Sequence, residues 1–456
     1  MENHKDRLLL IVTGGIVLLG IIGLFWWRAM NTIPAIKIPN PKMPSPNARD
    51  YFIAACNAMR DAQKIGYAYS DTKGPAPKPP TPPVPPSPPG AMPGVPPSAP
   101  PVSSVSPYEH AYSLAEKEEI VRHNAYALAT LRNGFAYPYW EAPARSFEVL
   151  YTHYPMFREM ARLLVLEGNT KAAHGDWGGA ADSYLDAMRL GADAPHGATL
   201  IGKLVGIASQ TIGRRAIWKV LDHLTADQAR RAARRMEDIV AREFPLADVL
   251  QEEKWLGLAG TLEVFRKTGV SGFVSTVAGS SGSTAGKLFD KLRSLRYSKR
   301  TIILNYSRYM DRMIANARLP YAAAPPAPPV PHDPVNDAIC PVFDRMQFSD
   351  ARGSAQNVLL LVSLALRAYW LERGEYPASL ADLAPSYLRK LPDDPFALKG
   401  TLRYKRTGRT YVLYSIGPDC RDDGGKRIDS RANARYGRQF SVEYDSKGDI
   451  VAGINQ

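Results

Sequence analysis

Residue types that build reactive or metal-binding sites are scarce in this chain. Its 456 residues include three cysteines and eight histidines. Three cysteines are too few for a cysteine-rich zinc site, and no pair of histidines has the HExxH spacing of a zinc metalloprotease. The sequence therefore offers no local motif for metal-assisted hydrolysis.

A glycine- and serine-rich stretch at residues 278–287, AGSSGSTAGK, falls short of a phosphate-binding loop. The first glycine of a Walker loop ending on Gly286 and Lys287 would fall on Ser281, and the hydroxyl that should follow is replaced by Leu288. The same stretch has no G-x-S-x-G nucleophile elbow. It is typical of a flexible loop between helices.

The chain is basic, with a formal net charge of +13. Its densest basic cluster consists of Arg230, Arg231, Arg234 and Arg235. Acidic residues such as Glu237 and Asp238 follow at once, which favours a solvated helix face over a nucleic-acid site. Because no zinc-finger or RNA-recognition pattern is present, we expect no specific nucleic-acid partner, and the charge suits anionic lipid or cell-wall polymers equally well.

Most of the 39 prolines fall in two segments, which we expect to be linkers: residues 74–107 and residues 319–336. Proline lacks the backbone N–H and fixes φ, so polyproline II is expected there, at about 3.1 Å per residue. The PxxP spacing could also dock on aromatic grooves.

Residues 8–27 form an uncharged run that predicts a transmembrane helix, since about 20 residues span the hydrocarbon layer. A cleaved signal peptide is the alternative, but Trp26 and Trp27 suit a membrane interface and the run is longer than a signal-peptide core. We expect a single-pass protein of the cytoplasmic (inner) membrane, anchored by residues 1–30. The flanking charges are nearly balanced, so the extracytoplasmic location expected for the bulk of the chain rests on the short N-terminal tail.

Two helical regions are expected after this anchor. Residues 31–73 contain a short membrane-proximal helical segment, in which Cys56 is interpreted as a buried small residue. Residues 108–318 are rich in strong helix formers and predict an all-α domain. Within it, Thr225 followed by Gln228 predicts a capping box.

One helix pair in this domain has a repeat-like pattern, with small residues that let helices approach and Tyr184 placed to fill the groove between them. The pattern between residues 160 and 195 resembles a tetratricopeptide helix pair. No convincing second or third copy follows, although about three repeats are needed for stability. We therefore expect a single hairpin inside a non-repeating bundle.

The C-terminal residues 337–456 predict an α+β domain. An apolar helix is expected at residues 357–370, a hairpin at residues 402–406 and 410–415, and a second strand pair at residues 440–444 and 450–454. This order, with Gly374-Glu375-Tyr376-Pro377 after the helix, resembles the globular domain of type II secretion major pseudopilins. The chain lacks the Gly-Phe-type processing site and the helix glutamate of that family.

The pseudopilin resemblance implies calcium in a late loop, here residues 415–425. The candidate ligands are the acidic residues Asp419, Asp422, Asp423 and Asp429. The alternative is a solvated turn whose carboxylates are neutralised by Lys426 and Arg427.

Two of the three cysteines, Cys340 and Cys420, fall in this same C-terminal block. An exported chain could join them in a disulfide, and two free buried thiols are the alternative.

Taken together, the sequence predicts a multi-domain protein: an N-terminal transmembrane helix, an all-α middle domain and a pseudopilin-like α+β domain. We expect a membrane-anchored, non-enzymatic binding or assembly component of the cell envelope, related to a type II secretion or pilus-like apparatus. Its expected partners are membrane lipid through residues 8–27 and other envelope proteins, and its oligomeric state is left open. The alternative is an envelope-associated hydrolase with a site composed of residues such as His153, Glu252 and Asp350.

Overall fold

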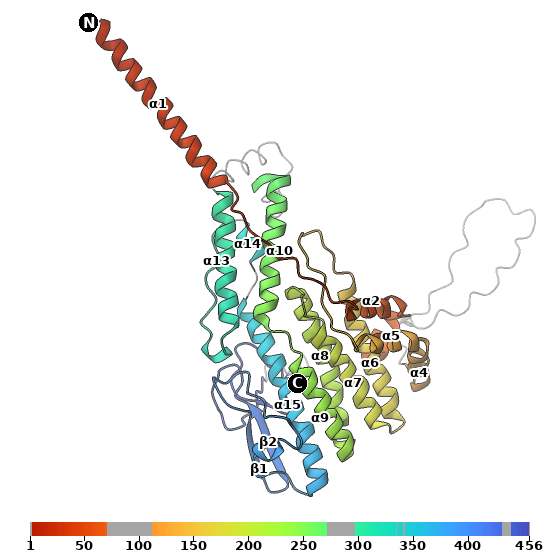
Figure 1. The fold of residues 1–456 in the computed structure, drawn as a ribbon. Coiled ribbons are helices and arrows are strands. Elements are labelled where there is room, and N and C mark those ends of the chain that lie inside the picture. The colour runs from red at the N-terminus through yellow and green to blue at the C-terminus, as the bar shows by residue number, and fades with distance from the viewer. Residues whose placement is uncertain are drawn as a thin grey trace, which may run out of the picture.

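The computed structural model describes residues 2–70, 112–270, 297–333, 335–340, 343–430 and 439–455. The protein is multi-domain and mostly helical, with one small antiparallel sheet (Figure 1). The α-helices are α1 Glu2–Asn31, α2 Ala48–Ala58, α3 Ala62–Ser70, α4 Leu114–His123, α5 Ala125–Gly134, α6 His153–Ala173, α7 Trp177–Asp193, α8 Leu200–Val220, α9 Ala226–Ala241, α10 Leu246–Lys267, α13 Lys299–Ala317, α14 Asn336–Ile339 and α15 Phe343–Arg373. Short 3-10 helices lie at Leu221–His223, Tyr321–Ala323 and Leu380–Leu383.

The predicted transmembrane helix is overturned by the structure. Residues 8–27 do lie in the helix α1, but among the residues described here no helix is both long and apolar enough to cross a membrane. The prediction of a single-pass inner-membrane protein, and the location derived from it, are therefore wrong.

The main body is a row of helices in which α7 lies between α6 and α8, and α9 lies between α7 and α15 (Figure 1). Glycines set how close these helices come. A Cβ on Gly191 of α7 would lie 2.5 Å from the carbonyl oxygen of Gly206 of α8, so only glycine permits this approach. In α6, Gly168 leaves the space that the Tyr184 ring fills, which confirms the predicted role of Tyr184.

The turn into α9 and the N-terminal helices also agree with the sequence. Thr225 and Gln228 form the predicted capping box. The helices α2 and α3 pack on α5 and α6, and Phe52 of α2 is fully buried there among other aromatic rings. A second, smaller core lies between α10 and α13, and Ile33, Ile36 and Ile38 pack against it.

The C-terminal block lies directly on the helical row because α15 packs along α9 and contacts α8. Its sheet has the order β1 Arg403–Thr407, β2 Thr410–Ser415 and β3 Ile450–Val451, with β1 paired to β2 and β2 to β3, both antiparallel. The predicted hairpin is confirmed, with Gly408 at φ +59° in its turn. Residues 440–444, expected as a strand, have no strand conformation.

Of the two proline-rich segments, residues 74–107 lie outside the described residues, as does the stretch at residues 278–287. The second segment runs along the body of the protein. The Tyr321 ring packs edge-on against Phe396, and Val335 is fully buried.

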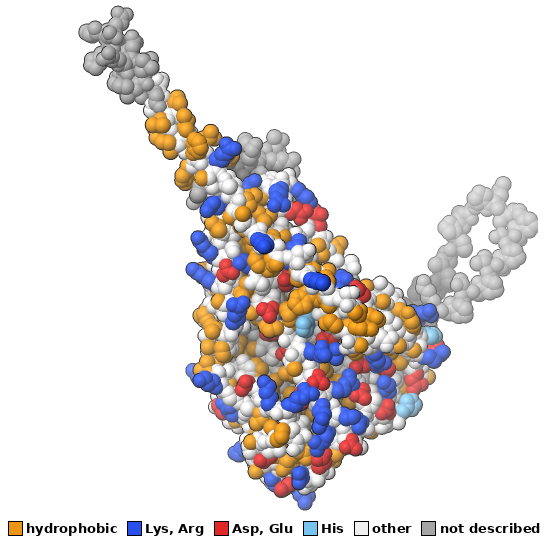
Figure 2. Space-filling view, in the orientation of Figure 1, with side chains coloured by type: hydrophobic (Ala, Val, Ile, Leu, Met, Phe, Trp, Pro, Cys, Tyr) orange, Lys and Arg blue, Asp and Glu red, His pale blue; other side chains and the backbone are white. Residues whose placement is uncertain are grey.

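The basic cluster on α9 was interpreted as a solvated helix face, and Arg231 and Arg234 are exposed, whereas Arg230 and Arg235 pair with acidic residues of neighbouring helices. Arg230 pairs with Glu372 of α15, and Arg235 pairs with Asp182 and Asp186 of α7. Over the face drawn in Figure 2, basic and acidic side chains are mixed, with no large area of one sign.

Candidate functional site

Three of the four predicted calcium ligands, Asp419, Asp422 and Asp429, accept hydrogen bonds from protein groups through their carboxylates. Asp422 accepts hydrogen bonds from the Tyr414 hydroxyl at 2.9 Å and from the backbone N–H of Gly424 at 3.0 Å. Asp429 accepts from the side-chain amide of Gln439 at 3.0 Å. The carboxylate of Asp419 accepts from the backbone of Arg421 at 3.3 Å, while the N–H of Asp423 points to Asp449 at 3.4 Å. Within the described ranges, no three acidic, histidine or cysteine side chains converge as a metal site, so calcium binding stays a prediction.

A carboxylate that the sequence analysis missed organises this acidic loop. Asp449 is fully buried and accepts hydrogen bonds from the backbone N–H groups of Gly425, at 2.8 Å, and Asp423. Burial raises the pKa of Asp449 to about 6, and the nearby charges of Asp422 and Asp423 add to the rise. The sequence signal for Asp449 is the Gly448-Asp449 pair before β3. Because many turns contain such a pair, it does not predict a buried carboxylate.

Cys340 and Cys420 are free thiols and are half-buried, which differs from the two buried thiols expected as the alternative to a disulfide. Cys56 is 2% exposed, and burial raises the pKa of its thiol to about 12. The interpretation of Cys56 as a buried small residue is therefore confirmed.

The three residues named for a hidden hydrolase site are held apart by separate partners. His153 bonds to Glu141 at 2.8 Å. Glu252 pairs with Arg145 at 3.0 Å, and Asp350 pairs with Lys203 at 2.6 Å. Of the three, only His153 lines a cavity large enough for a ligand.

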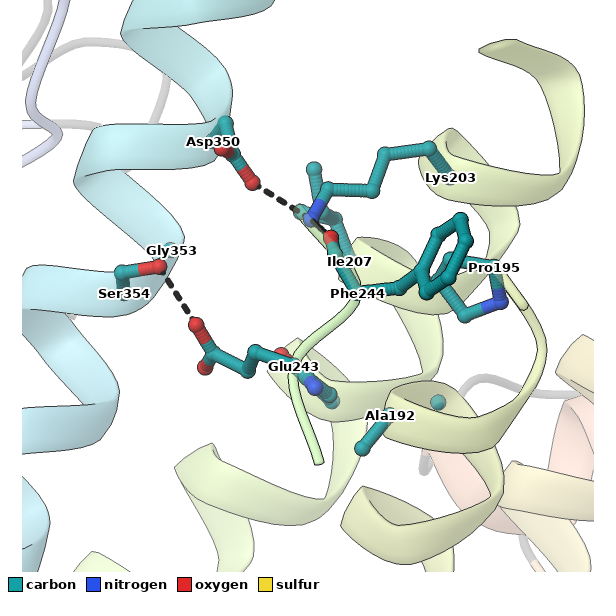
Figure 3. A pocket seen from close by; sticks show the side chains of 11 residues that line it. Ala192, Pro195, Lys203, Ile207, Glu243, Phe244, Asp350, Gly353 and Ser354 are labelled. Carbon is teal, nitrogen blue, oxygen red and sulfur yellow. Dashed lines mark hydrogen bonds and ion pairs between the residues drawn. The ribbon is translucent and has the colours of Figure 1, made fainter. Parts of the chain in front are cut away.

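Asp350 lies in a polar seam between α8 and α15 (Figure 3). Beside its pair with Lys203, Ser354 donates to Glu243 at 2.7 Å. The space among these residues is about 10 Å³, which is the room of a single water molecule. A space of this size admits no substrate. The polar contacts of the seam therefore hold α8 and α15 together.

The same seam continues into a fully buried arginine. Arg214 of α8 donates to the side-chain oxygens of Asn357, at 2.8 Å, and Gln356, at 2.6 Å, both on α15. Burial, and then the charges of Arg215 and Arg352, lower the pKa of Arg214 to about 9. Arg214 also donates to the Thr211 hydroxyl on its own helix at 3.2 Å, and its two shorter bonds are those to the amide oxygens of α15.

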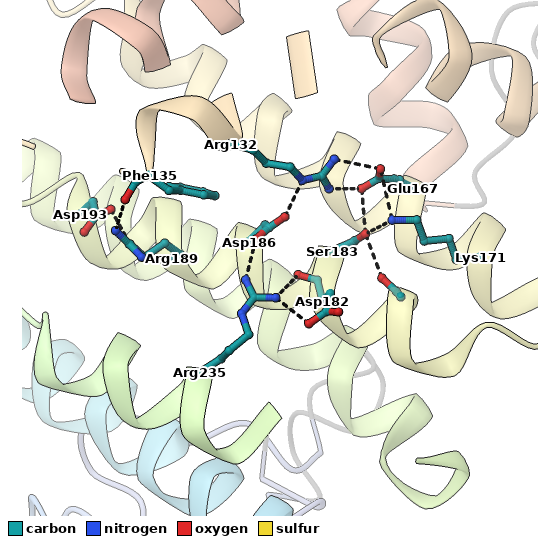
Figure 4. A network of polar contacts seen from close by, with 11 residues as sticks. Arg132, Phe135, Glu167, Lys171, Asp182, Ser183, Asp186, Arg189, Asp193 and Arg235 are labelled. Atoms are coloured by element: carbon teal, nitrogen blue, oxygen red, sulfur yellow. Dashed lines mark hydrogen bonds and ion pairs between the residues drawn. The ribbon is translucent and has the colours of Figure 1, made fainter. Parts of the chain in front are cut away.

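A second charged network crosses the outer helices (Figure 4). Arg132 bridges Glu167 and Asp186, while the Ser183 hydroxyl accepts from Lys171 at 2.9 Å and donates to Glu167 at 2.7 Å. A serine bonded to a lysine is the arrangement of some nucleophiles. Ser183 is fully buried, however, so no substrate reaches it and the network ties α5, α6 and α7 together.

Another polar site surrounds Glu141, which lies in the connection between α5 and α6. This connection is fixed by Asn47, the N-cap of α2, whose side chain exchanges two hydrogen bonds with the backbone of Trp140, at 2.9 and 3.1 Å. The backbone N–H of Glu141 donates to the carbonyl of His196 at 2.8 Å. The backbone on both sides of Glu141 is thus held before its side chain makes any contact.

The carboxylate of Glu141 accepts four hydrogen bonds. One oxygen receives Arg49 Nε at 2.5 Å and the N–H of Ala142 at 2.9 Å, and the other receives the Tyr139 hydroxyl at 2.9 Å and His153 Nε2 at 2.8 Å. Burial alone would raise the pKa of this carboxyl, but the bonds and charges of His153 and Arg49 outweigh burial and lower the pKa to about 2. Glu141 is therefore a fixed negative charge with its acceptor capacity filled.

Glu141 lies at the base of a hollow of about 500 Å³, a size ordinary for ligand sites. The hollow is lined by Arg49, Ile53, Cys56, Asn57, Glu141, Ala142, Pro143, Val149, Leu150, Tyr151, Thr152, His153 and Met156. We call it the Glu141 hollow. His153 is the first residue of α6, and Arg49 lies in the first turn of α2, so two helix starts and one connection build it.

An apolar groove of about 460 Å³ adjoins this hollow and shares three lining residues with it, Val149, Leu150 and Tyr151. We call it the α6–α8 groove. Its other lining residues are Tyr154, Pro155, Arg158, Ile201, Leu204, Val205 and Ala208. Leu150 is 81% exposed, Ile201 54% and Leu204 47%, so the apolar walls face solvent.

A comparison of this chain with protein-family models, with curated proteins and with solved structures gives no match.

Proposed function

We propose that this protein is a non-enzymatic binding component that docks a segment of a protein partner in the α6–α8 groove. The observation that carries the proposal is the group of exposed apolar side chains that form the groove, above all Leu150, Ile201 and Leu204. Contiguous exposed apolar side chains on a folded surface mark interaction sites. Their burial by a partner would supply the free energy of binding.

The chemistry of the neighbouring hollow favours binding over catalysis. Burial raises the pKa of the Cys56 thiol to about 12 and also raises the pKa of the Tyr151 hydroxyl. Activated nucleophiles have lowered pKa values, so both shifts have the wrong direction for a nucleophile. The best feature for a hydrolase is the carboxylate-oriented imidazole of His153. The carboxylate beside it, Glu141, has a lowered pKa, but its lone pairs are occupied by four protein donors, so it is not free to act as a nucleophile.

The partner segment is expected to be apolar with acidic residues. Arg158 is exposed and lines the groove, and the chain as a whole carries a net charge of +13. A field of this sign steers acidic partners to the surface. A place beside a type II secretion or pilus-like apparatus is a proposal supported only by the C-terminal resemblance.

Selection of peptides by the full chain from a random display library tests the docking function. We expect enrichment of segments with two or more apolar residues, and at least tenfold weaker binding to the double variant Ile201→Ser, Leu204→Ser. The matched control is Leu398→Ser, because Leu398 is 61% exposed and lies in the C-terminal block away from the groove. Equal binding by both variants, or no enrichment at all, would contradict the docking function.

A further inference from the structure

We propose that the docked segment carries an aspartate or glutamate side chain, and that the Glu141 hollow receives its carboxylate. This inference rests on the proposed docking function, because the groove supplies the rest of the contact. The two sites adjoin at Val149, Leu150 and Tyr151, so neighbouring residues of one extended segment reach both. Successive side chains of an extended segment point to opposite sides, which lets one enter the hollow while others cover the groove.

The hydrogen-bonding capacity of the hollow selects an acceptor. An ionised carboxylate offers about four lone-pair sites, and all four of Glu141 are occupied by protein donors. A ligand that brings only donors, such as an ammonium group, therefore finds no place on Glu141. The guanidinium of Arg49, which also lines the hollow, still has donors to offer.

Arg49 is the main remaining donor. Its Nε is used by Glu141, which leaves the two outer nitrogens of the guanidinium to face a ligand. The ion pair of Arg49 Nη1 with Asp50 is long, at 4.0 Å, and the side chain of Asp50 is 75% exposed. A carboxylate that entered the hollow would replace this weak contact by charge-assisted hydrogen bonds, for which the planar guanidinium is well shaped.

His153 is oriented by the same carboxylate. Because a carboxylate can only accept, Nε2 of His153 donates to Glu141, and the donors that select a carboxylate ligand are those of Arg49. The fixed charge of Glu141 holds the ring in place and balances the positive charge of Arg49. The Arg49 guanidinium, which lines the hollow, is thus held in position by Glu141 before a carboxylate ligand arrives.

The openness of the groove favours a protein segment over a fatty acid. Sites for small apolar ligands bury 70–90% or more of the ligand surface, roughly, inside a concave pocket. Here Leu150 is 81% exposed at the junction of hollow and groove, so an acyl chain would stay largely in water. A partner protein covers these walls with its own surface.

The experiment compares matched peptide pairs on the full chain. The most enriched acidic peptide from the display selection is synthesised together with its amide counterpart, in which aspartate or glutamate is replaced by asparagine or glutamine. Binding is measured by fluorescence anisotropy. We expect the acidic form to bind about tenfold more tightly, the usual size of a charge-assisted contact of this kind.

Two variants at the rim separate charge from bulk. Thr152 is exposed, makes no capping bond at the start of α6 and lines the hollow. Thr152→Glu places a carboxylate in the hollow, where it competes with the ligand, and a negative charge at a helix start preserves folding. Thr152→Gln adds the same bulk without charge. We expect Thr152→Glu to weaken binding of the acidic peptide about fivefold more than Thr152→Gln does, with no such difference for the amide peptide.

Each result has one meaning. Equal binding of acidic and amide peptides, both lost in the Ile201→Ser, Leu204→Ser variant, would overturn the carboxylate receptor and leave the docking function standing. Peptides that bind only through a free C-terminal carboxylate, or displacement of the acidic peptide by dodecanoate at lower concentration, would overturn the side-chain assignment. Loss of all peptide binding would overturn both proposals together.

Discussion

The Glu141 hollow and the polar seam between α8 and α15, which includes Arg214, contain the same kinds of groups. They differ in the space that these groups leave open. Each holds an arginine and a glutamate among buried polar partners. The seam leaves about 10 Å³, while the hollow leaves about 500 Å³. A buried polar cluster that fills its own space can only hold helices together, whereas one that leaves donors facing a cavity can also bind a ligand.

Removal of the seam arginine should give the largest effect. Arg214→Ala leaves the side-chain oxygens of Asn357 and Gln356 without their donor in a fully buried place. We expect a loss of about 3–5 kcal/mol in the free energy of unfolding, measured by urea denaturation. The exposed Arg231→Ala on α9 is the control and should change stability by about 0.5 kcal/mol or less. A seam variant as stable as this control would contradict a structural role.

The carboxylate of the hollow should have the next largest effect, and it should depend on pH. The pKa of Glu141 is lowered from 4.5 to about 2, so its contribution of about 3 kcal/mol is present above the unfolded pKa and is lost as the pH falls through the folded pKa. Glu141→Gln should remove this contribution at neutral pH. The free energy difference between wild type and variant should shrink as the pH is lowered from about 5 toward 2. A constant difference would show that the charge of Glu141 is not involved.

The acidic loop provides a third polar cluster, in which Asp422 pairs with Arg403 at 3.1 Å and Asp429 lies 3.9 Å from Arg427. If calcium binds there, a concentration ten times its Kd adds about 1.4 kcal/mol to stability and raises the melting temperature. Asp422→Asn should abolish the rise, while Asp50→Asn in α2 should leave it unchanged. No change in melting temperature at millimolar calcium would remove the calcium prediction and leave Asp449 as the organiser of the loop.

The smallest effect on stability is expected at the junction of hollow and groove. Leu150→Ser should change the free energy of unfolding by about 0.5 kcal/mol or less, because Leu150 is 81% exposed. Truncation of a leucine inside the body, Leu359→Ala at a fully buried position of α15, should lower the free energy of unfolding by about 3 kcal/mol. Peptide binding, measured as above, should show the reverse order. Similar stability losses at the two positions would mean that Leu150 belongs to the core.

Local patterns in the sequence predicted the parts of the fold that depend on neighbouring residues. The capping box of Thr225 and Gln228 was predictable because its hydrogen bonds join residues three positions apart. The hairpin was predictable because Gly408 marks the turn between its two strands. The membrane prediction used the length of the uncharged run at residues 8–27 and the tryptophans at its end, yet no described helix is long and apolar enough to cross a membrane. The prediction of a helix at residues 8–27 is confirmed, whereas the prediction that it crosses a membrane is wrong.

The candidate site could not be predicted because its residues are distant along the chain. Arg49 and Glu141 are separated by 92 positions, and Arg214 and Asn357 by 143. No spacing rule connects such pairs, and each residue taken alone looks like an ordinary polar or charged surface residue. His153 was singled out for its chemistry, but its partner Glu141 was not, since nothing near it marks a buried carboxylate.

The helix α15 has a mechanical consequence for the whole molecule. Its 31 residues form a rod of about 46 Å, and it is shared by both cores: Met346 is buried in the smaller one and Leu364 in the larger. Neither core can melt without losing packing against this rod. Heating should therefore produce one cooperative unfolding transition for the helical row and the sheet, and a protease cut within α15 should release both at once.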